Sequence, residues 1–197
     1  MQDQLLEDAR RIEECVRPLP PPRSTPALVV VSGLPGSGKS YFCRRLASRH
    51  PIARLESDAL RQALFGQPTH SPEESRRLFA ACHYVLERLL GAGIPALLDA
   101  TNLREVHRRQ LYAIADRHGV KLVLVSLRAP AAVVEERLAA RARRADPADL
   151  SAAGAEVYQR MRSLDEPIGR PHIVVDTSAD IEPAVEAVLR ELEERRQ

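Results

Sequence analysis

From Ala27 onward, short apolar runs alternate with longer segments whose apolar residues recur at helical spacing. This alternation is typical of a parallel sheet that is covered by helices. We expect strands at residues 27–32, 52–56, 94–99, 121–127 and 172–176. The predicted fold class is therefore α/β, with about five parallel strands and with helices on both faces of the sheet.

The helices between these strands carry start and stop signals. The clearest one follows Ser71, which fits an N-cap, with Pro72 in the first turn and Glu74 as a capping-box acid, and it ends near Gly91. Asp180 precedes the last of four further helices, which are expected at about 103–118, 130–143, 151–163 and 180–195.

The N-terminal segment has a pattern of its own. Apolar residues between Leu5 and Val16 recur at helical spacing, and the proline-rich stretch PLPPPRSTP follows. We therefore expect an amphipathic helix on a stiff tether over residues 1–26, ahead of one globular domain over residues 27–197. Because such a helix can dock on its own chain or on a second copy, homo-oligomerisation through it stays open.

Length and composition fit one ordinary domain. The 197 residues are 44% hydrophobic and 28% charged, and the formal net charge is +2. No apolar run approaches the roughly 18 residues that a membrane span requires, and the first residues carry acids where a secretory leader would be basic, so we expect a cytoplasmic protein without a membrane partner. The small net charge argues against wrapping a long polyanion over the whole surface, although it permits a local basic groove.

The stretch SGLPGSGKSYF contains the motif G-x-x-x-x-G-K-S between an apolar strand and a helix. In this context backbone N–H groups and the helix N-terminus hold phosphates, Lys39 reaches the β- and γ-phosphates, and the Ser40 hydroxyl ligates Mg²⁺. The motif therefore predicts ATP or another NTP together with Mg²⁺. The expected nucleotide-binding residues are Gly33, Pro35, Gly36, Ser37, Gly38, Lys39, Ser40 and Tyr41.

This loop alone is compatible with GTPases, mechanical ATPases and kinases. A GTPase needs N-K-x-D and a D-x-x-G directly after a strand, and neither occurs. A ring ATPase is expected to be larger and to close a strand with two acids, whereas the stretch LLDA contains only one. A kinase needs an acceptor site with a base, and arginines that close over the transferring phosphate.

Candidates for the acceptor site lie in LESDALR, directly after the second expected strand. Asp58 would lie at the carboxyl edge of the sheet, and Arg61 would share its helical face. A carboxylate there can accept the proton of an acceptor hydroxyl while the arginine holds an anionic group. The alternative is that Ser57 or Asp58 only caps the helix.

The stretch LLDATN supplies a second group of candidates. Asp99 closes the third expected strand and is expected to hold the hydration shell of Mg²⁺ together with Ser40, with helix capping as the alternative. Thr101 and Asn102 are expected to contact the acceptor.

Arginines dominate the stretch EERLAARARRADPADLSAAG. Arg137 and Arg141 lie one helical turn apart, and a lid is expected at about residues 141–155. Such arginines can neutralise the transferring phosphate, which would make them catalytic together with Lys39 and Asp58. The alternative is a solvated arginine-rich face, which is also the expectation for residues 107–109.

Taken with their spacing, these motifs resemble the 5′-hydroxyl polynucleotide kinases of phage and bacteria, within the zeta-toxin-like P-loop kinases. The resemblance covers about residues 27–177 and is carried by GLPGSGKS, SDALR, LDATN and the lid arginines followed by EVYQRM. It implies a P-loop kinase fold with an arginine-bearing lid, and Mg²⁺-dependent transfer of the NTP γ-phosphate to the 5′-OH of DNA or RNA.

By this resemblance Asp58 activates the 5′-hydroxyl, Arg61 contacts the neighbouring phosphate of the acceptor, and Arg137 or Arg141 closes on the donor phosphates. Small-molecule kinases of the same superfamily, which act on nucleotide sugars, antibiotics or sugars, share most of these residues. A small acceptor is therefore one alternative, and a non-catalytic nucleotide-binding module whose first helix docks a partner is another.

Overall fold

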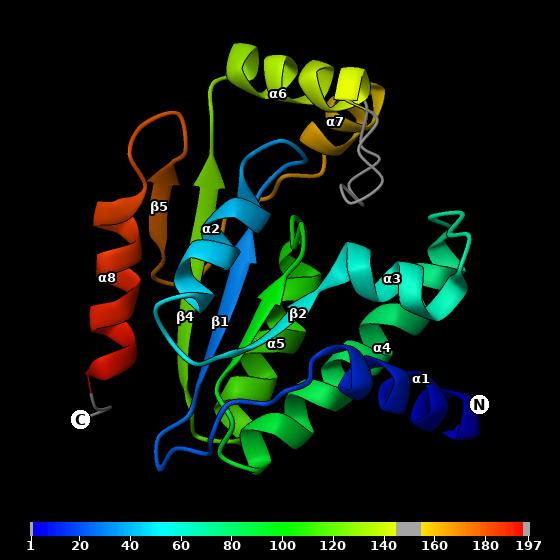
Figure 1. Ribbon diagram of the computed structural model, residues 1–197, viewed down its shortest axis with the longest axis vertical. Coiled ribbons are helices and arrows are strands. Elements are labelled where there is room, and N and C mark those ends of the chain that lie inside the picture. The colour runs from blue at the N-terminus through cyan, green and yellow to red at the C-terminus, as the bar shows by residue number, and fades with distance from the viewer. Residues whose placement is uncertain (1, 145–154, 195–197) are drawn as a thin grey trace.

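The computed structural model describes the main chain of residues 2–144 and 155–194, and the side chains of 2–140 and 157–194 (Figure 1). One sheet of five parallel strands has the order β2-β3-β1-β4-β5. The strands are β1 Ala27–Ser32, β2 Ala53–Glu56, β3 Ala96–Asp99, β4 Lys121–Arg128 and β5 Ile173–Asp176. Each lies within two residues of its expected bounds, so the predicted α/β class and parallel sheet are confirmed.

The helices cover both faces of this sheet. They are α1 Gln2–Cys15, α2 Lys39–Ala47, α3 Ser57–Phe65, α4 Pro72–Gly91, α5 Glu105–Arg117, α6 Ala131–Arg144, α7 Ala155–Arg162 and α8 Glu182–Glu193. Alternate side chains of β1 divide between two cores, because successive strand residues point to opposite faces. Leu28 and Val30 join the core with α1, α3, α4 and α5, whereas Val29 and Val31 join the core with α2 and α8. None of the helices described is long and apolar enough to cross a membrane.

The expected site residues lie at the carboxyl ends of the strands, along one edge of the sheet. Figure 1 shows α6 and α7 at the top of the molecule, beyond the ends of β1 and β4. At this edge Asp99 of β3 is in register with both Val31 of β1 and Glu56 of β2. The loop after β1, the start of α3 and the loop after β3 therefore meet in one place.

Helix α1 docks on its own chain. Ala9 and Ile12 are buried in the core with α4. Asp8 is also buried, and the guanidinium of Arg77 on α4 donates to both oxygens of its carboxylate at 3.0 to 3.2 Å. The apolar face on which the homo-oligomer hypothesis relied is therefore covered by the chain itself.

Arg108 on α5 is fully buried, at 0% exposure, so its expected place on a solvated face is wrong. Its guanidinium donates to the carboxylate of Glu105 at 2.8 Å. It also donates at 2.6 to 2.8 Å to four backbone carbonyls, those of Asn102, Leu103, Glu166 and Pro167. Arg108 thus joins the start of α5 to the segment that follows α7.

We expect Arg108→Leu to lower the free energy of unfolding by about 3 to 5 kcal/mol, because the partly buried Glu105 carboxylate and four backbone carbonyls lose their donor. Urea unfolding followed by circular dichroism measures this change. Arg109→Leu, at the exposed neighbouring position, is the matched control and should change stability by about 0.5 kcal/mol or less. Equal unfolding midpoints for the two variants would show that the Arg108 contacts contribute no net stability.

Candidate active site

The phosphate-binding loop, residues 33–40, forms the turn from β1 into α2. Gly36 and Gly38 have φ of 78° and 85°, in the left-handed region that favours glycine. A Cβ at Gly36 would lie 2.8 Å from Val134 Cγ1, and a Cβ at Gly38 would lie 3.2 Å from Thr177 Oγ1. Gly38 is the N-cap of α2 and provides no side-chain cap, so the first N–H groups of α2 are open to an anion.

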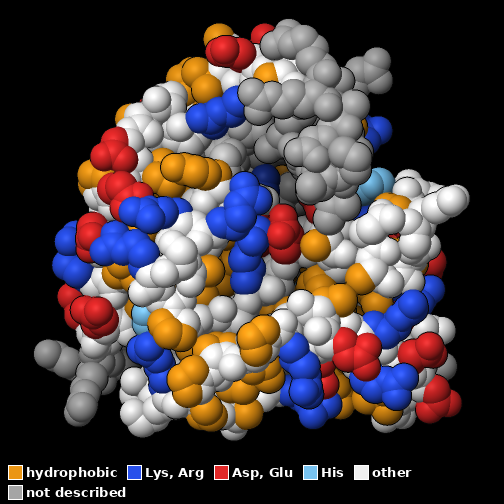
Figure 2. Space-filling model, in the orientation of Figure 1, with side chains coloured by type: hydrophobic (Ala, Val, Ile, Leu, Met, Phe, Trp, Pro, Cys, Tyr) orange, Lys and Arg blue, Asp and Glu red, His pale blue; other side chains and the backbone are white. Residues whose placement is uncertain are grey.

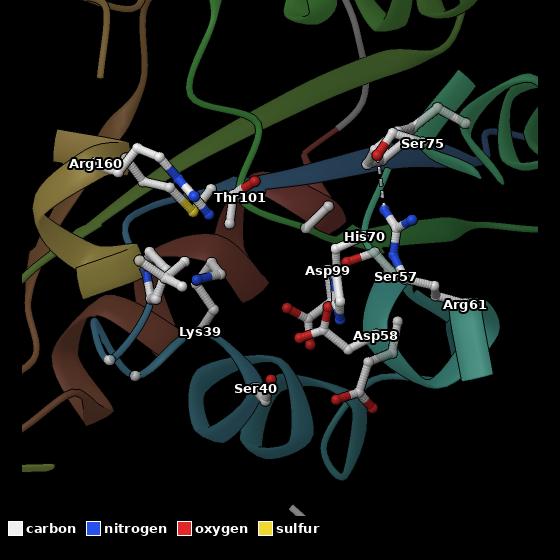
Figure 3. Close-up of a pocket in the computed structure, with 18 residues that line it drawn as sticks. Lys39, Ser40, Ser57, Asp58, Arg61, His70, Ser75, Asp99, Thr101 and Arg160 are labelled. Carbon is white, nitrogen blue, oxygen red and sulfur yellow. Dashed lines mark hydrogen bonds between the residues drawn. The ribbon is translucent and has the colours of Figure 1, made fainter. Parts of the chain in front are cut away.

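A cavity of about 520 Å³ opens at this loop (Figure 3). Its walls come from the loop, the end of β2, the start of α3, α4, the end of β3 and α7. Nine expected site residues line it, namely Pro35, Gly36, Gly38, Lys39, Ser40, Asp58, Arg61, Asp99 and Thr101. The cavity thus brings the expected phosphate-binding residues and the expected acceptor residues together.

Four other expected residues do not line this cavity. A Cβ at Gly33 would lie 2.6 Å from the Leu127 carbonyl oxygen, so this glycine permits the close approach to β4. The Ser37 hydroxyl is buried and has no hydrogen-bond partner among the described residues. The side chain of Tyr41 is turned to solvent and 60% exposed. Asn102 was expected to contact the phosphate acceptor. Its buried amide instead donates to the Val31 carbonyl at 2.7 Å.

Asp58 enters the cavity from the first turn of α3. That helix begins at Ser57, and its N-cap residue is Glu56, which makes no side-chain capping bond. The alternative that Ser57 or Asp58 only caps the helix therefore does not apply, because neither occupies the cap position. Burial raises the pKa of the Asp58 carboxyl above its ordinary value of 3.8, and the charge of Asp99 raises it further. The nearby side chains of Lys39, His70 and Arg61 oppose this rise in the pKa of Asp58.

Arg61 lies about one helical turn after Asp58 on α3 and is only 7% exposed. Its Nη2 donates to the Ser75 hydroxyl at 3.1 Å. Its Nη1 lies 3.5 Å from Glu74 Oε2 and has no hydrogen-bond partner among the described residues. Arg61 also lines the cavity, and a guanidinium in a cavity wall is suited to bind an anionic group.

Glu74 holds the loop before α4 and differs from the expected capping box. The Ser71 hydroxyl accepts from the Glu74 N–H at 3.2 Å, as an N-cap should. The Glu74 carboxylate, however, accepts from the backbone N–H groups of Thr69 and His70 at 2.8 to 3.1 Å. This arrangement fixes the His70 backbone at the cavity.

Asp99 is 3% exposed and lies beside a second carboxylate that the sequence analysis did not identify. Nη2 of Arg54 lies 2.8 Å from Asp99 Oδ2 and 2.7 Å from Glu56 Oε2. Burial raises the pKa of the Glu56 carboxyl, and the nearby Ser40 hydroxyl opposes this shift. The parallel register that pairs Glu56 with Asp99 is the signal that could have identified Glu56.

These oxygens fit a magnesium site. Among the described residues no group of three His, Cys, Asp or Glu side chains could hold a metal by itself. Mg²⁺ is commonly held by one or two carboxylates together with water and substrate phosphates, so Ser40, Glu56 and Asp99 suffice as protein ligands. Asp99 does not cap α5, which begins at Glu105.

Arg137 does not line the cavity. Its Nη1 donates to Thr177 Oγ1 at 2.9 Å and lies 3.4 Å from the Gly36 carbonyl, and its Nη2 donates to the Thr177 carbonyl at 2.6 Å. The loop after β5 thus holds the guanidinium against the backbone of the phosphate-binding loop. The side chain of Arg141 and most of the expected lid at about 141–155 lie outside the described residues.

Several cavity residues had not been singled out from the sequence. Phe79 and Ser75 come from α4, and His70 from the loop before it. Arg160 and Met161 come from α7, within the stretch EVYQRM. That stretch carried part of the family resemblance, and it is the sequence signal that could have directed attention to Arg160.

Comparison with known proteins identifies the family of this chain. A model described as an AAA domain, AAA_33, matches residues 28–168. The chain belongs to this family. A search of curated proteins gives no match to this AAA_33 chain.

Solved structures similar to this AAA_33 chain include kinases. Kti12 of Chaetomium thermophilum in complex with ADP-AlF3 has a TM-score of 0.66 at 20% identity, over 84% of this chain and 98% of that chain. A sugar kinase from Janibacter has a TM-score of 0.63 at 18% identity, over 86% and 95%. A gluconokinase from Sinorhizobium meliloti has a TM-score of 0.59 at 25% identity, over 87% and 94%. These likenesses agree with a P-loop kinase fold.

Proposed function

We propose that this AAA_33 chain is a Mg²⁺-dependent kinase that transfers the γ-phosphate of ATP or another NTP to the hydroxyl of an acceptor bearing an anionic group. The favoured acceptor is the 5′-OH end of DNA or RNA. The observation that carries the proposal is the shared cavity, in which the phosphate-binding loop faces Asp58 and Arg61.

In this mechanism each residue has one task. Lys39 neutralises the donor phosphates, and Mg²⁺, when bound through Ser40, Glu56 and Asp99, supplies further neutralisation of the β- and γ-oxygens. Arg61 holds the anionic group of the acceptor so that its hydroxyl lies in line with the γ-phosphorus. The hydroxyl oxygen forms the new bond to phosphorus, the bond to the bridging oxygen breaks, NDP leaves, and Asp58 takes the hydroxyl proton.

A nucleic-acid end fits this chemistry because it carries a hydroxyl and a phosphate on one nucleotide. On the face shown in Figure 2, acidic and basic side chains are interspersed instead of forming one extended basic surface. Together with the net charge of +2, this favours contacts to the terminal nucleotides over contacts along a long strand.

A small-molecule acceptor is the second candidate. The cavity of about 520 Å³ lies within the size range of small-molecule pockets, roughly 300 to 1,000 Å³. The similar structures also include proteins named as a sugar kinase and a gluconokinase.

Phosphate transfer from labelled ATP to 5′-OH DNA and RNA oligonucleotides, a nucleoside 3′-phosphate and gluconate tests the proposal. We expect label on the oligonucleotides, with an apparent affinity that falls about sevenfold between 50 and 200 mM salt if two phosphates of a single strand are contacted. Arg61→Leu should raise the KM for phosphate-bearing acceptors, whereas Arg76→Leu, at an exposed position of α4, should not.

Label on gluconate alone, without salt dependence, would instead support the small-molecule kinase. ATP binding without transfer to any acceptor would contradict the kinase proposal and favour the non-catalytic nucleotide-binding module.

A further inference from the structure

The cavity wall contains a basic side chain that was not expected from the sequence, Arg160. The described Asp, Glu, Lys and Arg side chains of its wall are three acids, Glu56, Asp58 and Asp99, and three bases, Lys39, Arg61 and Arg160. Arg61 comes from α3 and is bound to Ser75 on the acceptor side. Among the described side chains of this wall, Lys39 and Arg160 therefore remain to face a highly charged triphosphate.

Arg160 approaches the cavity from α7. In the view of Figure 3 its side chain extends from α7 toward the cavity, on the side of Lys39 and Thr101 and away from Arg61. Within the described residues its guanidinium makes no hydrogen bond or ion pair, and only its backbone carbonyl is engaged, as acceptor from the Ser163 hydroxyl. The guanidinium is thus available to a ligand.

Packing fixes α7 relative to the phosphate-binding loop. Tyr158, two residues before Arg160, is 4% exposed and forms a small core with Val134 and Leu138 of α6. Leu34 of the phosphate-binding loop packs against this core. The base of the Arg160 side chain is therefore held at a defined distance from the loop, which is what pre-organised contact with a phosphate requires.

We propose that Arg160 contacts the transferring phosphoryl group, the task that the sequence analysis gave to Arg137 or Arg141. The inference rests on the proposed kinase function. A planar guanidinium can donate two N–H groups to the equatorial phosphoryl oxygens, whereas Arg137 is already bound to Thr177 and the loop backbone.

Binding of ADP with Mg²⁺, with and without aluminium fluoride, tests this role by calorimetry and needs no acceptor. The parent should bind ADP with aluminium fluoride at least about 100-fold more tightly than ADP alone, since the fluoride complex mimics the transferring group. Arg160→Ala should bind ADP alone like the parent and lose most of this gain, and Arg160→Lys should recover only part of it. Arg162→Ala, an exposed arginine of the same helix outside the cavity, should keep the full gain.

An equal gain in the parent and in Arg160→Ala would overturn the proposal, and so would the absence of any gain in the parent. Failure of the kinase proposal has a different signature. In that case the parent shows the gain with aluminium fluoride, Arg160→Ala loses it, and no acceptor becomes labelled in the transfer assay.

Discussion

Asp58→Asn is expected to bind ATP like the parent and to transfer phosphate about 10² to 10⁴-fold more slowly, the usual contribution of a general base. The amide keeps the shape of the carboxyl group but cannot take a proton. Helix α3 should be unaffected, because Asp58 is not its N-cap residue. Single-turnover transfer from labelled ATP to a 5′-OH oligonucleotide, beside calorimetric ATP binding, measures both quantities.

The pH profile provides a second measurement on Asp58. Burial raises the pKa of its carboxyl above 3.8, and a base acts in its ionised form, so kcat/KM of the parent should rise with pH through that raised pKa and then level off. Asp58→Asn should lack this rise. Because burial also raises the pKa of Glu56, Glu56→Gln is the necessary control. Loss of the rise in Glu56→Gln, with its retention in Asp58→Asn, would show that Asp58 is not the base.

The fold and the gathering of the main site residues at one edge of the sheet were predictable for physical reasons. Fully buried parallel strands appear in a sequence as short apolar runs, so all five were located. The carboxyl ends of parallel strands meet at one edge, so Asp58 and Asp99, at the ends of two strands, were expected to gather there with Lys39 from the loop after the first strand. The cavity contains all three.

The arginine assignments depended on partners that no local pattern reveals. Arg137 was expected to act on phosphate because of its helical spacing, yet its partner is Thr177, 40 residues later. Arg108 lies between exposed neighbours, yet it binds carbonyls of Glu166 and Pro167, 58 and 59 residues away. A guanidinium binds whichever carbonyls tertiary packing brings within reach, so its role follows from the three-dimensional structure and not from its spacing.

Lys39→Ala is expected to weaken ATP binding and to abolish measurable transfer. The Lys39 ammonium donates to the Leu34 carbonyl at 2.9 Å, so it already lies over the phosphate-binding loop. At about 4 Å from a phosphate charge, in an effective dielectric of about 20, an ammonium contributes about 4 kcal/mol, close to 10³-fold in affinity. Lys121→Ala is the control, because the only other lysine of the chain pairs with Glu191 on α8 and lies outside the cavity. Calorimetric ATP affinity for Lys39→Ala equal to that of Lys121→Ala would show that the cavity is not the nucleotide site.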